Sequence, residues 1–175
     1  MSDLHDQVVG DRDFFTRILG KIPGFKGYIE REGRRSSDKM LREMVSQRFE
    51  EQWQRISALQ RDLISSGGLS FVDDLEASAL KIRQFVDRVK TASYGYAGFF
   101  DAKKINEAEL VKLYEYDLSL LTQVDEVKRA IDHVEASIGT DGLPASIRNL
   151  TSVAQSSVDL FNRRDEVILS TQAAE

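Results

Sequence analysis

The sequence predicts an all-α protein, an antiparallel four-helix bundle with a short N-terminal amphipathic helix. Three observations predict it. Only two prolines occur among 175 residues. The eleven glycines gather at a few points, which are the natural breaks between elements. Between these points, apolar residues recur at steps of three and four, the spacing of one face of a helix.

Composition limits the classes of protein to consider. Apolar residues make up 41% and charged residues 30%, which is typical of one folded domain with wide solvated faces. We expect a lead with a short helix over residues 1–24 and a single helical-bundle domain over residues 25–175. The absence of cysteine excludes disulfides, thiolate nucleophiles and cysteine metal sites.

The first elements follow in chain order. Residues 11–19 read as a short amphipathic helix capped by Asp11, and the Ile22-Pro23-Gly24 turn follows it. A long helix then begins between Tyr28 and Ser37, and whether it is continuous through Gly33 stays open. Its inward stripe consists of Leu41, Val45, Phe49, Trp53, Ile56, Leu59 and Leu63.

A second helix is expected over residues 70–93, after the flexible turn at residues 65–68. It carries an unbroken heptad seam of Val72, Leu75, Ala79, Ile82, Val86 and Val89. The short turn predicts that these two helices pack antiparallel. Residues 94–103, which hold four aromatic residues and two glycines, are expected to form a connecting loop.

A third helix is expected from the capping residue Asn106, and its seam contains Leu110, Leu113, Asp117, Leu120, Val124, Val127, Ile131, Val134 and Ile138. After a turn at residues 139–142, Pro144 opens a fourth helix that runs to about residue 170. The inward positions of that helix are Ile147, Leu150, Ala154, Val158, Phe161 and Ile168.

No pattern in the chain supports catalysis. The two histidines, His5 and His133, lack the Glu-x-x-His spacing of a carboxylate metal centre, and we expect His133 to be an exposed helix residue. Phosphate-binding glycine loops and nucleophile motifs are absent. We therefore expect no enzymatic activity, no cofactor and no metal site. Asp117, the polar seam member, is either paired with a cation and sets the register, or acts as a ligand or switch.

Charge is distributed unevenly along the chain. Residues 1–42 contain nine Lys or Arg and seven Asp or Glu, whereas the rest contains 15 and 22. An acidic body argues against a nucleic-acid partner, because phosphate binding needs a basic face. No apolar run approaches the ~20 residues that span a bilayer, and the polar N-terminus does not resemble a secretory signal. A cytoplasmic location is expected, with peripheral contact to the inner membrane as an alternative.

Segment 14–28 combines large apolar side chains with cations. It could lie in an anionic membrane interface, or it could fold back over the bundle as a short helix. The residues that would meet the membrane are Phe14, Phe15, Arg17, Ile18 and Lys21.

One end of the bundle is expected to carry both aromatic and basic residues. If the first two long helices are antiparallel, the start of one and the end of the other lie together. The candidate partner-binding residues there are Phe25, Tyr28, Arg31, Arg34, Arg35, Lys39, Tyr94, Tyr96, Phe99 and Phe100. They form either a recognition surface for a protein partner or, alternatively, an aromatic plug beside a solvated face of self-paired charges.

A short motif resembles a known group of proteins. Ile22-Pro23-Gly24-Phe25-Lys26-Gly27-Tyr28-Ile29-Glu30-Arg31, followed by Arg34-Arg35 and Asp38-Lys39-x-Leu41-Arg42, resembles an uncharacterised bacterial all-helical family of unknown function. The layout of a short amphipathic helix before a helical hairpin is similar to that of phage-shock and ESCRT-III-like proteins, without a residue-level match.

These observations predict a helical interaction or scaffold protein that binds another protein through its aromatic and basic end. The alternative is a peripheral membrane protein that uses segment 11–28. The partner's identity is open, and so is homo-oligomerisation, because heptad seams can be satisfied within one chain or between two.

Overall fold

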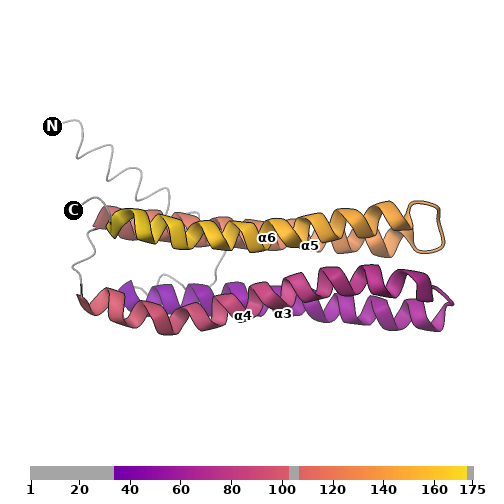
Figure 1. Cartoon of the computed structure of the whole chain (residues 1–175), viewed down its shortest axis with the longest axis horizontal. Helices are drawn as coiled ribbons and strands as arrows, with labels where there is room; N and C mark the ends of the chain where they lie inside the picture. Colours follow the sequence, from indigo (N-terminus) through magenta and orange to yellow (C-terminus); the bar gives the residue numbers. More distant parts are fainter. Residues whose placement is uncertain (1–33, 103–106, 173–175) are drawn as a thin grey trace, which may run out of the picture.

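A computed structural model describes the backbone of residues 34–102 and 107–172, and the side chains of residues 40–91, 116 and 119–163. In this part of the chain there are four long α-helices, one 3-10 turn and no strand (Figure 1). The elements in order are α3 (Arg34–Ser65), η1 (Leu69–Phe71), α4 (Val72–Ala102), α5 (Glu107–Ser137) and α6 (Leu143–Gln172). The predicted all-α bundle is confirmed.

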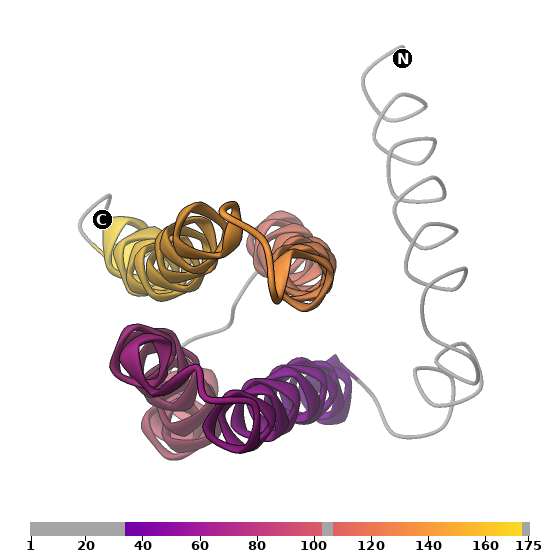
Figure 2. The same cartoon turned by 90° about the vertical axis from the view of Figure 1, so that its right-hand side faces the viewer.

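The helices form two antiparallel hairpins. In the first hairpin, Lys90 of α4 donates to Glu50 of α3 at 2.7 Å, and Gln60 of α3 donates to Glu76 of α4 at 2.8 Å. Later residues of α3 thus meet earlier residues of α4, as the short turn between them predicts. The helices of the α5/α6 hairpin are also antiparallel, and the turn between them lies at the same end of the molecule as the turn between α3 and α4 (Figures 1 and 2).

The two hairpins lie alongside each other with like-directed helices in contact. Hydrogen bonds between α4 and α6 advance together along both helices, joining Ser78 to Thr151, Lys81 to Gln155 and Arg88 to Asn162. These pairs therefore define a parallel contact. Because α3 packs on α5 and α4 on α6, α4 and α5 occupy diagonally opposite corners of the bundle (Figure 2).

A glycine pair ends α3 in the way that its sequence predicts. Gly67 has φ +83°, a backbone conformation that costs glycine little and other residues more. The Gly68 amide donates to the Leu63 carbonyl at 2.7 Å, and the Gly67 amide donates to the Ile64 carbonyl at 3.4 Å. Both bonds satisfy carbonyls that the helix end would leave without partners, the pattern of a Schellman motif.

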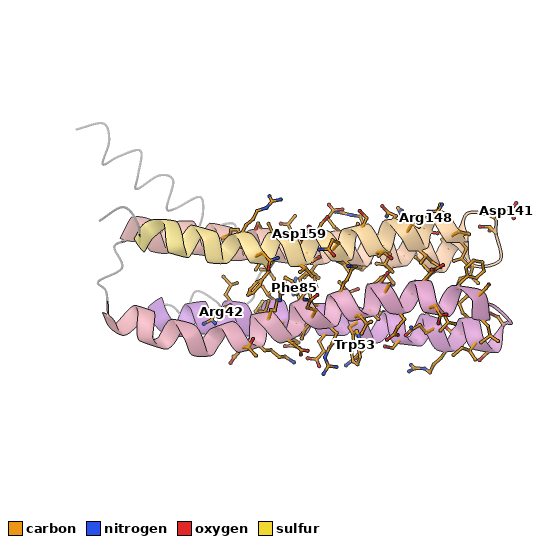
Figure 3. The ribbon with its side chains drawn as sticks, viewed as in Figure 1. Arg42, Trp53, Phe85, Asp141, Arg148 and Asp159 are labelled. Carbon is orange, nitrogen blue, oxygen red and sulfur yellow. The ribbon has the colours of Figure 1, made fainter. Side chains whose placement is uncertain are left out.

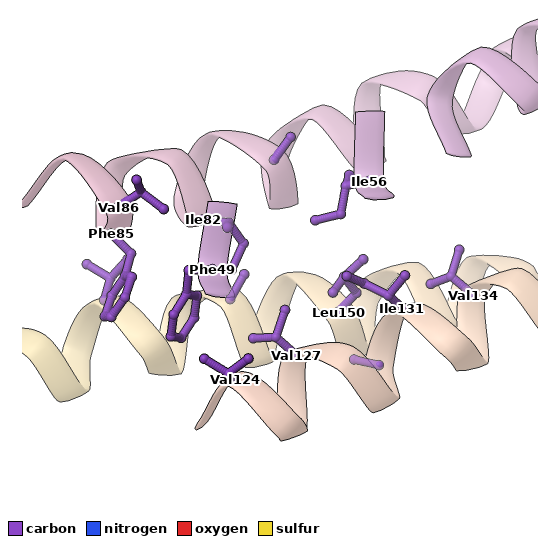
Figure 4. Close-up of a cluster of buried hydrophobic side chains, with 14 of the residues drawn as sticks. Phe49, Ile56, Ile82, Phe85, Val86, Val124, Val127, Ile131, Val134 and Leu150 are labelled. Carbon is purple, nitrogen blue, oxygen red and sulfur yellow. The ribbon is translucent and has the colours of Figure 1, made fainter. Parts of the chain in front are cut away.

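The core runs along the axis of the bundle and contains the predicted seams. Phe49 and Phe85 pack with ring centroids 4.0 Å apart, and Phe161 meets Phe85 edge-on at 5.8 Å, so three helices share one aromatic cluster (Figure 4). Predicted seam members that are buried include Leu41, Val45, Ile56, Leu75, Ile82, Val86, Leu120, Val124, Val127, Ile131, Val134, Ile147, Leu150 and Ala154. Buried apolar residues that the seams omitted are Phe85, Leu121, Ala130 and Leu143.

Some sequence predictions were wrong. Residues 94–102 were expected to form a loop, but α4 continues through them to Ala102. Glycine lowers helix propensity by only about 1 kcal/mol, so two glycines among helix-compatible neighbours do not suffice to end a helix. Ile138 was expected in the core but is 37% exposed, because α5 ends at Ser137 and Ile138 lies beyond the last packed turn.

Trp53 also departs from its predicted place in the seam. It is only half-buried, and the Arg83 guanidinium lies over its ring at 5.0 Å from the centroid. Gln52, one position earlier, is buried instead. The inward stripe of α3 therefore passes through position 52, and the indole lies at the edge of the α3/α4 contact, where a cation can stack on it.

Candidate functional site

The described side chains form no cluster that could bind a metal ion. No group of three or more His, Asp or Glu there is placed to hold a metal ion. His133 is exposed on α5, which confirms the prediction for this residue. The candidate functional features of the described part lie on its surface and at the two ends of the bundle.

The first end contains the start of α3 and the finish of α4. Because these helices are antiparallel, Arg34, Arg35 and Lys39 lie in the first turns of α3 at the same end as the last turns of α4 (Figure 1). Tyr94, Tyr96, Phe99 and Phe100 belong to those last turns. We call this region the basic–aromatic end. The backbone thus brings seven of the predicted partner-binding residues to one end, while their side chains lie outside the described residues.

The helical conformation of residues 94–102 separates the four aromatics by register. After Val89, the seam of α4 continues at steps of four, three and four through Ser93, Tyr96 and Phe100. Tyr94 and Phe99 fall off this stripe. The two predicted roles therefore divide between the two pairs of aromatics. Tyr96 and Phe100 occupy seam positions, which suit a core plug, whereas Tyr94 and Phe99 occupy positions off the seam, which suit a recognition surface. A loop would not have separated the pairs in this way.

Other predicted residues lie outside the described part of the chain. Among the partner-binding residues these are Phe25, Tyr28 and Arg31. The whole membrane segment, with Phe14, Phe15, Arg17, Ile18 and Lys21, lies there too, and so do the short helix at residues 11–19 and the cap at Asn106. The backbone of Asp117 belongs to α5, but its side chain is not described, so its role stays a prediction.

Arg42 corrects one expectation about the basic cluster. Together with Arg31, Arg34, Arg35 and Lys39 it forms a basic cluster for which the sequence predicts either a solvated face or a docking patch, but its side chain is only 6% exposed. Ser46, one turn later on the same side of α3, is 3% exposed. The buried stripe is therefore wider here than the seam through Leu41 and Val45, and Figure 3 shows where Arg42 lies along α3.

A charged cluster joins the two hairpins midway between core and solvent. Arg55 of α3 donates to Asp132 at 2.7 Å and to Glu135 at 2.9 Å, both on α5, and Lys128 also contacts Asp132 at 2.8 Å. Hydrogen bonds from Lys128 and Arg55 lower the pKa of Asp132. Burial would lower the pKa of Arg55, but its hydrogen bonds to Asp132 and Glu135 raise it above the ordinary value.

No pattern in the sequence predicts this cluster. Arg55 looks like any exposed helix charge, since it falls between the seam positions Gln52 and Ile56. Its partners lie 77 and 80 positions away in sequence. Periodicity shows which face of a helix is inward, but not which other helix a flanking charge will meet.

The second end of the bundle holds the two turns, between α3 and α4 and between α5 and α6 (Figures 1 and 2). Three large apolar side chains are exposed there: Ile64 at 51%, Leu69 at 65% and Ile138 at 37%. We call the surface formed by these three residues the apolar tip. Only one other large apolar residue of the described part is as exposed, namely Leu80 at 60% on the side of α4.

No protein-family model, curated protein or solved structure matches the chain. Of the described helices, none combines the length and the hydropathy that crossing a lipid bilayer requires. The resemblance of residues 22–42 to an uncharacterised bacterial family stays a prediction.

Proposed function

We propose that this chain is a non-enzymatic interaction or scaffold protein that binds another protein through its basic–aromatic end. One observation carries the proposal. The antiparallel pairing of α3 and α4 gathers the cations of residues 34–39 and the aromatics of residues 94–100 at one end of a rigid rod. Aromatic and arginine side chains dominate the binding energy of protein interfaces, so this composition suits a recognition surface.

The frame behind this end supports the proposal. Lys90 of α4 pairs with Glu50 of α3 at 2.7 Å, and the Phe49–Phe85 stack lies next to this pair in sequence. These contacts hold α3 and α4 in one register up to the last turns before the basic–aromatic end. A surface presented on packed helices loses little conformational entropy when it binds, which favours affinity.

The register of the aromatics provides a sharp test. Tyr94→Ala with Phe99→Ala removes the two off-stripe rings, whereas Tyr96→Ala with Phe100→Ala removes the two rings on the seam. We expect the first double variant to lose partners captured from source cells at unchanged thermal stability. The second is expected to lower the melting temperature. The proposal would be overturned if the variant Tyr94→Ala with Phe99→Ala and the variant Arg34→Glu with Arg35→Glu both captured the same partners as the wild type.

Membrane association through segment 11–28 is the alternative, and its composition favours it. Residues 14–28 contain three cations, no acidic residue and the apolar side chains of Phe14, Phe15 and Ile18. Such a segment binds anionic head groups when its apolar face enters the interface. In this case the chain would lie at the inner surface of a membrane rather than free in the cytoplasm.

Flotation with anionic vesicles tests the alternative. The full chain would float, and a chain that lacks residues 1–24 would stay at the bottom of the gradient. Arg17→Glu with Lys21→Glu would abolish flotation without removing any apolar group. Equal behaviour of the full and shortened chains would exclude this function.

A further inference from the structure

The apolar tip carries a surface that the bundle itself leaves uncovered. Ile64 lies in the last turn of α3, Leu69 opens η1, and Ile138 directly follows α5. More than half of the side chains of Ile64 and Leu69 remains exposed. Both turns face the same way (Figure 2), so the three residues belong to one end of the rod. A surface of this kind is a candidate docking site when a complementary partner can be named.

Charge narrows the choice of partner. Residues 59–77 and 133–148, which form this end, contain six acidic residues and two arginines, whereas the whole chain has a net charge of −5. Within the described part, Glu76 is bound by Gln60 and Glu135 by Arg55. Asp62, Asp73, Asp74 and Asp141 are exposed and take part in no ion pair among the described residues. Figure 3 shows Asp141 at the extreme end of the α5/α6 turn.

A ligand that fits this surface must be cationic and apolar over a short length. Segment 14–28 of this chain has that composition: Arg17, Lys21 and Lys26, no acidic residue, and Phe14, Phe15, Ile18 and Phe25. Opposite charges across an interface speed association and set its orientation, while the apolar groups supply the binding energy. The chain thus contains both halves of a complementary pair.

Chain geometry prevents residues 22–28, seven of the fifteen residues of this segment, from reaching the tip of their own molecule. The 32 residues of α3 separate residue 34 from the tip by about 48 Å at ~1.5 Å per residue. Residue 28 is six positions before Arg34, and six fully extended residues span at most about 21 Å. Residue 22 reaches at most ~42 Å, so residues 22–28 cannot bind the tip within one molecule.

We propose that the apolar tip of one copy binds segment 14–28 of a second copy, so that the protein assembles head to tail. The inference goes beyond the proposed function, because segment 14–28 precedes α3 in sequence and is not part of the basic–aromatic end. The contact joins two different surfaces and is heterologous. Each bound copy still offers one free tip and one free segment, so assembly grows as an open chain rather than stopping at a dimer.

Sedimentation velocity of the full chain tests the assembly. At about 50 mM salt we expect a weight-average mass that rises with concentration beyond about twice the monomer's 19.8 kDa. At about 500 mM salt, screening of the charges returns it to the monomer value. Two variants of the tip, Asp73→Asn with Asp74→Asn and Ile64→Ala with Leu69→Ala, should each abolish growth. All four positions are exposed, so the fold is expected to survive, and circular dichroism checks it.

A matched control has the same charge change away from the tip. Glu51→Gln with Asp125→Gln removes two exposed carboxylates from the sides of α3 and α5, and it should assemble like the wild type. If this control also loses assembly, the effect is one of net charge, and the tip is not the site.

Mixing two inactive variants tests the heterologous geometry. Either tip variant keeps segment 14–28 intact, and the variant Arg17→Glu with Lys21→Glu keeps the tip intact. Neither should assemble alone, but together they should form a 1:1 complex of about twice the monomer mass that grows no further. No complex in the mixture, or a wild-type chain that is monomeric at low salt, would overturn the inference. That result would leave the proposed function standing if Tyr94 and Phe99 still govern capture of another protein.

Discussion

Arg55 and Asp132 lie 77 positions apart in sequence, yet the Arg55 guanidinium donates to the Asp132 carboxylate at 2.7 Å. The pair connects α3 to α5 and therefore one hairpin to the other. About a third of each side chain is open to solvent, 30% for Arg55 and 40% for Asp132. The interaction is thus partly screened, but its geometry includes a second carboxylate from Glu135.

Removing the arginine should loosen the contact between the hairpins. We expect Arg55→Ala to lower the free energy of unfolding by about 1 kcal/mol, since two charge-assisted hydrogen bonds are lost from a half-buried site. Urea denaturation at low and high salt measures this. Arg129→Ala serves as the control, because among the described residues Arg129 pairs only with Glu126 on its own helix, and the substitution should cost less than about 0.5 kcal/mol. Equal losses for the two variants would mean that Arg55 does not join the hairpins.

Two carboxylates give the stability a dependence on pH. Lys90 lowers the pKa of Glu50 from 4.5, and Lys128 and Arg55 lower that of Asp132 from 3.8. A pKa that is lower in the folded state means that the unfolded chain binds more protons, so stability rises with pH in this range. The contribution is complete above pH 4.5 and is lost as the pH falls through the folded values. The free energy of unfolding, measured from pH 7 to pH 3, should depend less on pH in Glu50→Gln and in Asp132→Asn than in the wild type.

The aromatic cluster should dominate the stability of the core. Phe85 is fully buried between Phe49 and Phe161. Phe85→Ala removes one ring of α4 that contacts a ring on α3 and another on α6, and it leaves a cavity, so we expect a loss of about 3–5 kcal/mol. Leu80→Ala, on the same helix but 60% exposed, should cost well under ~1 kcal/mol. Denaturant midpoints with unchanged slopes would show that both variants keep the native fold.

A pair of hydroxyl groups sets the parallel register of α4 and α6. Ser78 is fully buried, and its Oγ lies 2.8 Å from the Thr151 Oγ1. Ser78→Ala should cost about 1 kcal/mol, because it leaves the half-buried hydroxyl of Thr151 with one bond fewer. A double-mutant cycle with Thr151→Val isolates the pair, since contacting residues couple and distant ones do not. A coupling energy near zero would contradict a role for this pair in the register.

The turn between α3 and α4 depends on the left-handed backbone of Gly67. No atom lies within 4 Å of a Cβ built at this position, so the cost of Gly67→Ala is conformational rather than steric crowding. We expect about 1 kcal/mol for Gly67→Ala and less for Gly67→Asn, since asparagine tolerates this region better. Thermal unfolding of both variants measures the difference. If alanine and asparagine behave alike, the backbone conformation is not the cause.

The candidate site was predictable only in part. Helical periodicity and the short turn at residues 65–68 correctly implied that the start of α3 and the end of α4 share one end. The role of residues 94–102 was not predictable, because two glycines weaken a helix without forbidding it. The exposed Ile138 shows the same limit: its spacing matches the seam, but a seam position is buried only where a neighbouring helix covers it.

The sequence by itself determined the number of long helices in the described part and most of the inward stripe of each, with Trp53 and Ile138 as exceptions. Leu75, Ile82, Val86 and Val89 must face the core because a local spacing of three and four places them on one side, and apolar burial is the main driving force of folding. This information is contained within each helix. It does not depend on where the other helices lie.

Only the tertiary structure decided how the hairpins meet. The apolar seams fit two arrangements: a ring in which all neighbouring helices are antiparallel, or two hairpins with parallel helices in contact. The packing of apolar side chains between two helices does not by itself specify whether the helices run in the same or in opposite directions. The parallel contact pairs Ser78 with Thr151, and it brings Arg55 within reach of Asp132. Both turns, with Ile64, Leu69 and Ile138, lie at the same end of the rod in either arrangement, because α3 and α5 run in the same direction.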